Sequence, residues 1–430
     1  MGTFHRLFAV LRDRKGNAML IAAFAMPVLV GASGLATDTI QWTLWKRQLQ
    51  RQADSAALAG AYAKAQSGNV TTSATAEINR YNLVTLTGSP VIENAPTGGA
   101  FMGDTSAVRV SLTTSQTLPF SSFFLSSPPV ITAEATARVV ASGDYCATAL
   151  IKTTAVGITF SGNGTVDLGC GMATNSKAAN AVDANGSSKI IASPLAAMGG
   201  IQSSSNYASG TVLQPYSIEQ ADPFADLPTP VLPSDCKKNG QLSVGPKDDV
   251  QISVDSKTGE TCYTNMKIQG KLHLNPGIYY IDGGSLDVNS GAEITGDDVT
   301  IILTSSTAGT NPSSIGTINI NGGATVNLTN SDDGTYEGVL FYQDRRALSA
   351  QNNGSKYSNI INGNASSLLQ GAIYTPSQEV SFSGDSGMST NCLQLVALTL
   401  TFTGNSKISN KCLPESGASS FTGTVVRLVG

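Results

Sequence analysis

Few side chains in this sequence have the type and spacing that catalysis requires. Of its two histidines, His5 precedes a long apolar segment, so His273 is the one candidate for a histidine general base beyond that segment. Adjacent acids occur at Asp297–Asp298 and Asp332–Asp333, and Asp344 stands directly before Arg345 and Arg346. Carboxylates and basic residues gathered on one face of a protein are the groups with which glycan-cleaving enzymes work.

The positions of these residues favour structural roles. Neighbouring residues on a strand point to opposite faces, so neither pair of acids forms a joint site unless it lies in a turn. We interpret the pairs as turn formers, Asp344 with its arginines as a surface ion pair, and His273 as an exposed side chain. The sequence contains no GxSxG, HExxH or GxxxxGK[ST] motif. We therefore predict no catalytic, cofactor-binding or metal-binding residue, and we expect that the protein is not an enzyme and needs no cofactor.

A proline-rich stretch at residues 215–235 carries three more acids. It contains five prolines and little periodicity, which predicts an ordered surface excursion or a linker. We interpret Asp222, Asp226 and Asp235 as solvated turn residues. Calcium binding is the alternative, but the spaced oxygen ligands of a recognised calcium loop are missing.

The elements that carry these residues form a repeat. From about residue 144 the chain repeats an apolar, any, apolar pattern, then a polar turn of Gly, Asn or Ser, then a further apolar residue, at 160–166, 184–190, 288–294, 320–326, 382–388 and 402–408. Such turns accept positive φ and join short strands. The shortest separations between copies suit one coil of a parallel β-solenoid, and the longer ones leave room for intermediate coils. An antiparallel β-sandwich is the alternative.

The positions of the cysteines give an independent test of how the repeat copies align in successive coils. All six follow the apolar segment, and an even number without a CxxC pair favours disulfides in an oxidising compartment. Cys146 and Cys170, and likewise Cys392 and Cys412, have the spacing of successive repeat copies. Equivalent positions of stacked coils lie about 4.8 Å apart, within the reach of a disulfide. We therefore predict the bonds Cys146–Cys170 and Cys392–Cys412, which leaves Cys236 with Cys262.

The apolar segment near the N-terminus predicts a membrane anchor. Residues 17–37 lack ionisable side chains. The length of this span is close to the roughly 20 residues that a helix needs to cross a bilayer. A basic cluster before it predicts a cytoplasmic N-terminus. Helix-forming sequence continues to about residue 67. A cleavable secretory signal ending near Gly34 and Ala36, and prepilin-like cleavage after Gly16, are the alternatives.

Between anchor and repeat we expect a small α+β domain similar in outline to a pilin, by analogy at fold level. It comprises a helix at 72–82 and alternating strands around 108–112 and 131–139. An apolar cluster at 118–125 either caps the small core or contacts a partner or the membrane surface. The predicted segments are a basic cytoplasmic segment at 1–16, a transmembrane and stalk helix at 17–67, the pilin-like domain at 68–143 and the exported β-solenoid-like domain at 144–430.

The N-terminal 65 residues resemble the TadG-like (TadE/TadG-like) proteins of tight-adherence (Flp) pilus assembly systems. The resemblance rests on Gly16-Asn17-Ala18 after the basic cluster, on Pro27, on Gly34-Leu35-Ala36 followed by Asp38, and on Leu49-Gln50 with the Ala-rich run 53–61. It implies a role in pilus assembly. Many family members carry a metal-binding adhesion domain with a DxSxS motif, which this sequence lacks, so we do not carry metal-dependent adhesion over.

Composition agrees with an exported protein. Charged residues make up only 13% and the net charge is −4, which excludes a basic surface for nucleic acid. We predict a single-pass inner-membrane protein, mainly β beyond its helix, with its C-terminal domain periplasmic or on the cell surface. The predicted function is assembly or tethering of a tight-adherence pilus and surface adhesion. The expected partners are membrane lipid, pilus or secretion-system proteins and further copies through the stalk. A β-helical protein that binds or degrades polysaccharide is the alternative.

Overall fold

The computed structural model describes residues 16–80, 84–234, 236–349, 357–364, 367–384, 389–404, 407–410 and 421–430. The chain forms two compact units. Unit 1 comprises the residues up to Val140 together with Val426–Gly430, and unit 2 comprises Ala141–Val425. The last five residues thus group with unit 1, although we expected them in the exported domain. The predicted boundary at residue 144 itself stays a prediction.

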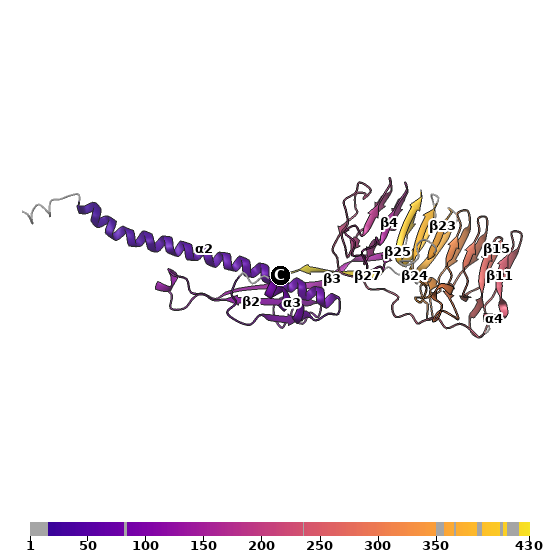
Figure 1. Cartoon of the computed structure of the whole chain (residues 1–430), viewed down its shortest axis with the longest axis horizontal. Helices are drawn as coiled ribbons and strands as arrows, with labels where there is room; N and C mark the ends of the chain where they lie inside the picture. The colour runs from indigo at the N-terminus through magenta and orange to yellow at the C-terminus, as the bar shows by residue number, and fades with distance from the viewer. Residues whose placement is uncertain are drawn as a thin grey trace, which may run out of the picture. The chain divides into compact units, whose positions relative to one another are not determined.

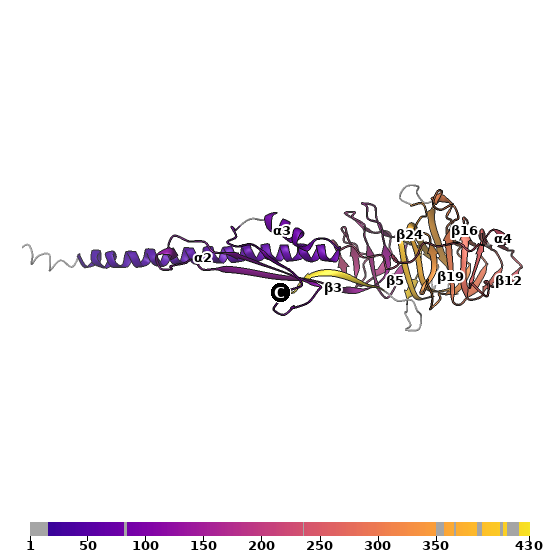
Figure 2. The same ribbon diagram turned by 90° about the horizontal axis from the view of Figure 1, so that it is seen from below.

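Unit 1 is built on one long helix. Its elements are α2 (Gly16–Ala65), α3 (Val70–Arg80), β1 (Val91–Asn94), β2 (Ala107–Thr114), the short 3-10 helix η1 (Ser121–Phe123) and the first part of β3 (Ile131–Ala149). β2 pairs antiparallel with both β1 and β3. The second half of α2 lies against α3 and β2 (Figures 1 and 2).

The small core of unit 1 follows the two expected periodicities. α2 buries Leu49, Ala53, Ala57 and Ala61, spaced by four residues on one helix face. The strand β2 buries alternate residues, as predicted from its sequence. Small alanines on α2 let helix and strand approach closely, so the second half of the helix is covered, whereas most of the described side chains before Gly34 are exposed.

Unit 2 contains β-strands, one short helix, α4 (Cys236–Asn239), and the 3-10 helix η2 (Pro312–Ser314). After the second part of β3 its strands are β4 (Ile158–Phe160), β5 (Thr165–Asp167), β6 (Gly171–Thr174), β7 (Val182–Ala184), β8 (Lys189–Ile191), β9 (Leu195–Ala197), β10 (Leu213–Gln214), β11 (Gln241–Val244), β12 (Asp249–Ile252), β13 (Glu260–Tyr263), β14 (Asn265–Ile268), β15 (Lys271–Leu274), β16 (Gly277–Asp282), β17 (Leu286–Val288), β18 (Glu293–Gly296), β19 (Val299–Thr304), β20 (Ile318–Ile320), β21 (Thr325–Thr329), β22 (Val339–Gln343), β23 (Ser358–Gly363), β24 (Leu368–Gly384), β25 (Ser389–Gly404), β26 (Lys407–Asn410) and the start of β27 (Phe421–Leu428).

These strands pair in parallel with a period of three. β11 pairs with β14, β14 with β17 and β17 with β20, and β12 and β13 begin two further series of the same kind. The pairings described between β4 and β26 are parallel, which is consistent with a solenoid of stacked three-strand coils. An antiparallel sandwich does not fit these pairings.

The order of the coils in the stack differs from their order in the chain. β25 pairs with β3 and β4, and β26 pairs with β5, so the last coil of the chain lies against the first (β25 and β4 in Figure 1). We call this junction between the last and the first coil the seam. From the seam the chain's first coils continue through β6 to β10. Residues 215–234 then lead to β11, from which the remaining coils return toward the seam. The long gap between the repeat copies at 184–190 and 288–294 therefore contains a jump between two separate runs of coils.

Within each run the predicted register is correct. Val288 pairs with Ile320, and Phe382 pairs with Phe402. At the seam Phe402 pairs with Phe160, and their rings stack with centroids 5.2 Å apart. These side chains belong to one continuous buried core that runs through the stack. Burying each such ring contributes about 1.5–3 kcal/mol.

Two of the three predicted disulfides are present. Cys146 is bonded to Cys170, and Cys236 to Cys262. Cys392 is disulfide-bonded, and its predicted partner Cys412 lies outside the described residues. The first bond joins neighbouring coils, as the repeat spacing predicted.

Candidate functional site

His273 belongs to a hydrogen-bonded ladder on three neighbouring strands. Its Nδ1 lies 2.7 Å from Thr295 Oγ1, and its Nε2 lies 3.0 Å from Asp249 Oδ1. Acid, histidine and hydroxyl in this order also occur in hydrolase triads. Here, however, the side chains of His273 and Asp249 are 40% and 66% exposed. The ladder therefore links successive coils on a solvent-facing surface, as expected of an exposed histidine.

The two pairs of acids do lie in turns, and the structure brings them together. Asp298 follows β18, and Asp332 and Asp333 follow β21, and all three line one cleft of about 390 Å³. Burial raises the pKa of Asp298, and the charges of Asp332, Asp297 and Asp333 raise it further. Among the described residues there is no group of three or more His, Cys, Asp or Glu arranged to hold a metal ion.

Asp344 is a buried residue, so its placement on the surface was wrong, although the ion pair itself is present. Its side chain is only 1% exposed, and its Oδ2 lies 2.6 Å from Arg346 Nη2 and accepts a hydrogen bond from Thr304 Oγ1 at 2.7 Å. Burial raises the pKa of Asp344, but the hydrogen bonds from Arg346 and Thr304 and the charge of Arg346 outweigh burial, so the pKa lies below its usual value. Asp344 is thereby occupied in holding β19 to the end of β22.

Arg345 holds the proline-rich excursion. Its Nε donates to Tyr374 Oη at 2.7 Å, its Nη1 donates to the Leu227 carbonyl at 2.7 Å, and its Nη2 donates to the Phe224 carbonyl. Asp222 accepts from Tyr374 Oη at 2.8 Å and from the Phe224 amide at 2.9 Å. The stretch 215–234 is thus an ordered excursion rather than a linker.

The excursion contains two further aspartates, Asp226 and Asp235. Asp226 is exposed, in agreement with a solvated turn acid, and Asp235 lies outside the described residues.

The first half of α2 presents an apolar surface. Its exposed side chains include Met19, Ile21, Phe24, Met26, Val28, Leu29 and Val30. Ile21–Ala65 contains a stretch long and apolar enough to cross a membrane. Exposed apolar side chains around a helix are expected where lipid, rather than water, is the solvent.

The loop between β2 and β3 docks on α2 directly after this apolar surface. Asp38, buried on α2, accepts hydrogen bonds through Oδ2 from the backbone amides of Phe120 at 3.1 Å and Ser121 at 2.6 Å. Gly34 lies one turn earlier, and a Cβ there would clash with the Phe120 ring. In the sequence, Gly34 stands out through the resemblance and the signal-peptide alternative, and Asp38 through the resemblance. Their docking role was missed, because the loop they hold lies more than 80 residues away.

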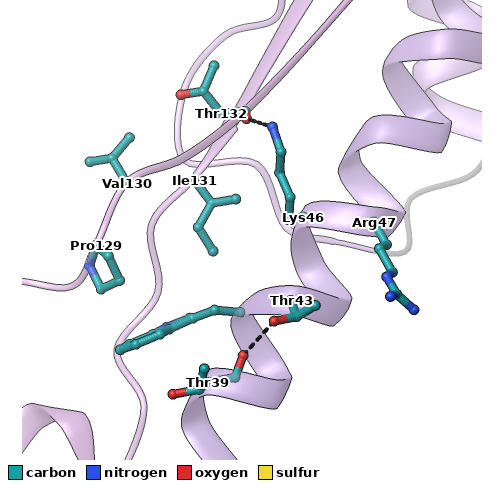
Figure 3. A pocket seen from close by; sticks show the side chains of 9 residues that line it. Thr39, Thr43, Lys46, Arg47, Pro129, Val130, Ile131 and Thr132 are labelled. Atoms are coloured by element: carbon teal, nitrogen blue, oxygen red, sulfur yellow. Dashed lines mark hydrogen bonds between the residues drawn. The ribbon is translucent and has the colours of Figure 1, made fainter.

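A groove of about 630 Å³ lies between α2 and the start of β3 (Figure 3). The helix contributes Thr39, Trp42, Thr43, Lys46 and Arg47, and the other wall is formed by residues 129–132. Lys46 Nζ donates to the Thr132 carbonyl across the groove (Figure 3). The groove thus combines an indole, apolar side chains and two basic groups next to the apolar half of the helix.

Comparison with known proteins finds one family match, and it lies on α2. Residues 16–64 match the family model described as Putative Flp pilus-assembly TadE/G-like. No curated protein and no solved structure matches the chain significantly. The match spans nearly all of α2, including Gly34 and Asp38, and confirms the resemblance seen in the sequence. Over residues 16–64 the chain is therefore similar to the TadE/TadG-like Flp pilus-assembly family.

Proposed function

We propose that this protein is a membrane-anchored structural component that helps to assemble or tether a tight-adherence (Flp-type) pilus and so supports surface adhesion. The observation that carries the proposal is the family match over α2, the same helix whose first half has an exposed apolar surface. In this proposal α2 crosses the inner membrane once, with its N-terminus in the cytoplasm. The parallel coils of unit 2 form an exported β-solenoid, periplasmic or at the cell surface.

The role that we propose is structural rather than catalytic. Asp344, the acid that the polysaccharide alternative would use, is buried and bonded to Arg346 and Thr304. Arg345 is bonded to the excursion. Two disulfides of unit 2 support a location in an oxidising compartment.

Deletion and complementation test the proposal. Deleting the gene should abolish or strongly reduce piliation and surface attachment, and the wild-type chain should restore both. A matched variant replaces residues 17–37 by an unrelated apolar helix of equal length, which keeps the protein in the membrane but removes the family-specific helix surface. We expect this variant to fractionate with the membrane and to fail in piliation. Normal pili in the deletion strain would contradict the proposal.

Topology is tested separately. An alkaline phosphatase domain fused after residue 67 should be active, because that enzyme folds only where disulfides form, and a fusion before residue 17 should be inactive. The reverse pattern would contradict the proposed orientation while leaving the role in pilus assembly open to the deletion test.

A further inference from the structure

The loop between β2 and β3 is unusual in its side chains. From Val110 to Ala133 the sequence contains no ionisable residue. Three consecutive apolar side chains at its tip are exposed, Phe123 by 84%, Phe124 by 68% and Leu125 by 45%, and Val130 is exposed by 68%. A soluble surface rarely leaves adjacent aromatic rings in water, so such a cluster marks a contact surface.

The place of this loop along α2 shows what it contacts. The Asp38 carboxylate and the gap left by Gly34 fix residues 120 and 121 to the last turn of the uncharged span. At about 1.5 Å per residue the uncharged stretch 17–37 is roughly 30 Å long, the thickness of a hydrocarbon core. The loop therefore meets the helix where the hydrocarbon ends. Beyond the strands, the loop extends along α2 toward the N-terminal half of the helix (Figures 1 and 2).

The side chains that follow on α2 suit the headgroup layer. Both tryptophans of the chain, Trp42 and Trp45, stand within two turns of Asp38. Tryptophan is enriched at the membrane interface. Lys46 and Arg47 line the groove beside Trp42, and the exposed Arg51 follows one turn later. Basic groups at this level complement anionic lipid headgroups.

We propose that residues 118–130 form a second membrane contact, in which Phe123, Phe124 and Leu125 enter the leaflet on the side of unit 1 beside α2. The groove with Trp42, Lys46 and Arg47 then faces the lipid headgroups. The occupant is lipid because exposed apolar side chains of both α2 and the loop flank the docking point, where the Asp38 carboxylate is buried, and the loop itself carries no ionisable side chain. The inference rests on the proposed membrane anchoring of α2 and adds a contact that fixes unit 1 against the bilayer.

Site-specific fluorescence in lipid tests this contact. Single cysteines replace Phe124, Val28 or Met102 in the full chain, and each carries an environment-sensitive fluorophore. The proteins are reconstituted in nanodiscs of phosphatidylcholine and phosphatidylglycerol, with and without brominated acyl chains. Val28, in the middle of the span, and Met102 are each exposed by 70%. Met102 belongs to unit 1 and lies three residues before Thr105, whose carbonyl accepts from Lys64 at the far end of α2, roughly 40 Å along the helix from the docking point.

The three labels separate the outcomes. We expect bromine to quench the labels at 28 and 124, the second at least half as strongly, and to leave the label at 102 unchanged. Quenching at 28 but not at 124 overturns the loop contact and leaves the anchor intact. A label at 124 that is shielded from aqueous iodide but not quenched by bromine indicates a protein partner and also overturns the proposal. Absence of quenching at 28 overturns the membrane anchoring itself.

A second variant tests the docking. Gly34→Val places side-chain atoms where the Phe120 ring lies, so the ring must shift, and we expect this shift to displace the loop from the helix. We expect bromine quenching of the label at 124 to fall toward the level at 102, while the label at 28 is unaffected. Gly31→Val is the matched control, because nothing lies within 4 Å of a Cβ at that position. Equal quenching in both variants would contradict the role of Gly34.

Discussion

At the scale of single residues, the buried Asp344 is the clearest case of a charge that stabilises this fold. Its folded pKa lies below the ordinary value, because its bonds to Arg346 and Thr304 outweigh the effect of burial. A carboxyl whose pKa is lower in the folded state contributes stability above its unfolded pKa of about 3.9. That contribution is lost as the pH falls through the folded pKa.

Asp344→Asn should therefore lower the free energy of unfolding at pH 7 by about 1.5–3 kcal/mol, the range for hydrogen bonds to a charged group. Urea unfolding of the detergent-solubilised protein at pH 7 and again below pH 4 measures the difference, which should shrink at the acidic pH. Asp226→Asn is the control, because Asp226 is exposed. An equal loss in both variants, or a loss that grows as the pH falls, would contradict this assignment.

The sequence could not distinguish the environments of these acids. The Asp344–Arg346 pair was predictable from its spacing, but its burial depends on Thr304 of the neighbouring coil, 40 residues earlier in the chain. In the same way, the sequence showed Asp297–Asp298 and Asp332–Asp333 as two separate turns. Only the stacking of β18 on β21 brings them to one cleft.

At the scale of elements, one carboxylate holds the β2–β3 loop on α2. Asp38→Ala should free the backbone amides of Phe120 and Ser121, each of which loses a charged acceptor. Losing such a bond costs about 1.5–3 kcal/mol, so we expect these amides to exchange hydrogen roughly tenfold faster or more. Hydrogen-exchange mass spectrometry in nanodiscs measures the change. Thr37→Ala, which loses only a hydroxyl bond within the helix, should leave the exchange unchanged. Unchanged exchange in Asp38→Ala would contradict the docking role.

The proline-rich excursion depends in a similar way on Arg345. Arg345→Met removes the donors to the Phe224 and Leu227 carbonyls while keeping an unbranched apolar chain. We expect protease cleavage within 215–234 to become several-fold faster, with the far-ultraviolet circular dichroism of the strands retained. Lys152→Met is the control, because Lys152 pairs with Glu219 at an exposed site whose contribution is small. Equal protection in both variants would show that proline stiffness and apolar packing alone hold the excursion.

Elements were the part of the fold that the sequence predicted best. Alternation marked β2, the uncharged and Ala-rich run marked α2, and the Gly and Asn turns marked the coils and their register. Each of these patterns is determined by residues that lie close together in the sequence, which explains why the predicted elements agree with the structure. The loop docking was not predictable, because Phe120 meets Gly34 only after β2 and β3 have packed on the helix.

At the scale of the whole molecule, the order of the coils is the feature that sequence reasoning missed. The spacing between repeat copies predicts how coils that follow one another in the sequence pair. It does not predict which coils from distant parts of the sequence pair with each other. Both β25–β4 and β24–β25 are pairings in register with apolar residues aligned, so their local chemistry is alike. What sets the order of the coils is the segment 215–234. It leads from β10 to β11, and each of these strands lies at the end of its run of coils.

Because strands of the two runs of coils pair at this seam, we predict that unit 2 stays assembled when the backbone is cut within residues 215–234. A protease site inserted between Pro230 and Val231 would yield two pieces, and neither of the disulfides Cys146–Cys170 and Cys236–Cys262 joins them. The pieces should nevertheless co-elute in gel filtration without denaturant, because β25 and β26 pair with β3, β4 and β5 across the cut. The backbone bonds between Thr136 and residues 429–430 of unit 1 add to this association.

Phe402→Ala isolates the contribution of the seam. The Phe402 ring stacks on Phe160 from the other piece, and truncating a buried phenylalanine costs about 3–5 kcal/mol. The cut variant should therefore dissociate at a lower urea concentration than the cut wild type, measured by the loss of co-elution. Phe421→Ala removes a partly exposed ring that stacks on Tyr145 across the same cut, and it should shift the midpoint less because less of that ring is buried. Separation of the wild-type pieces without urea would show that the strands of the seam do not hold the two runs of coils together.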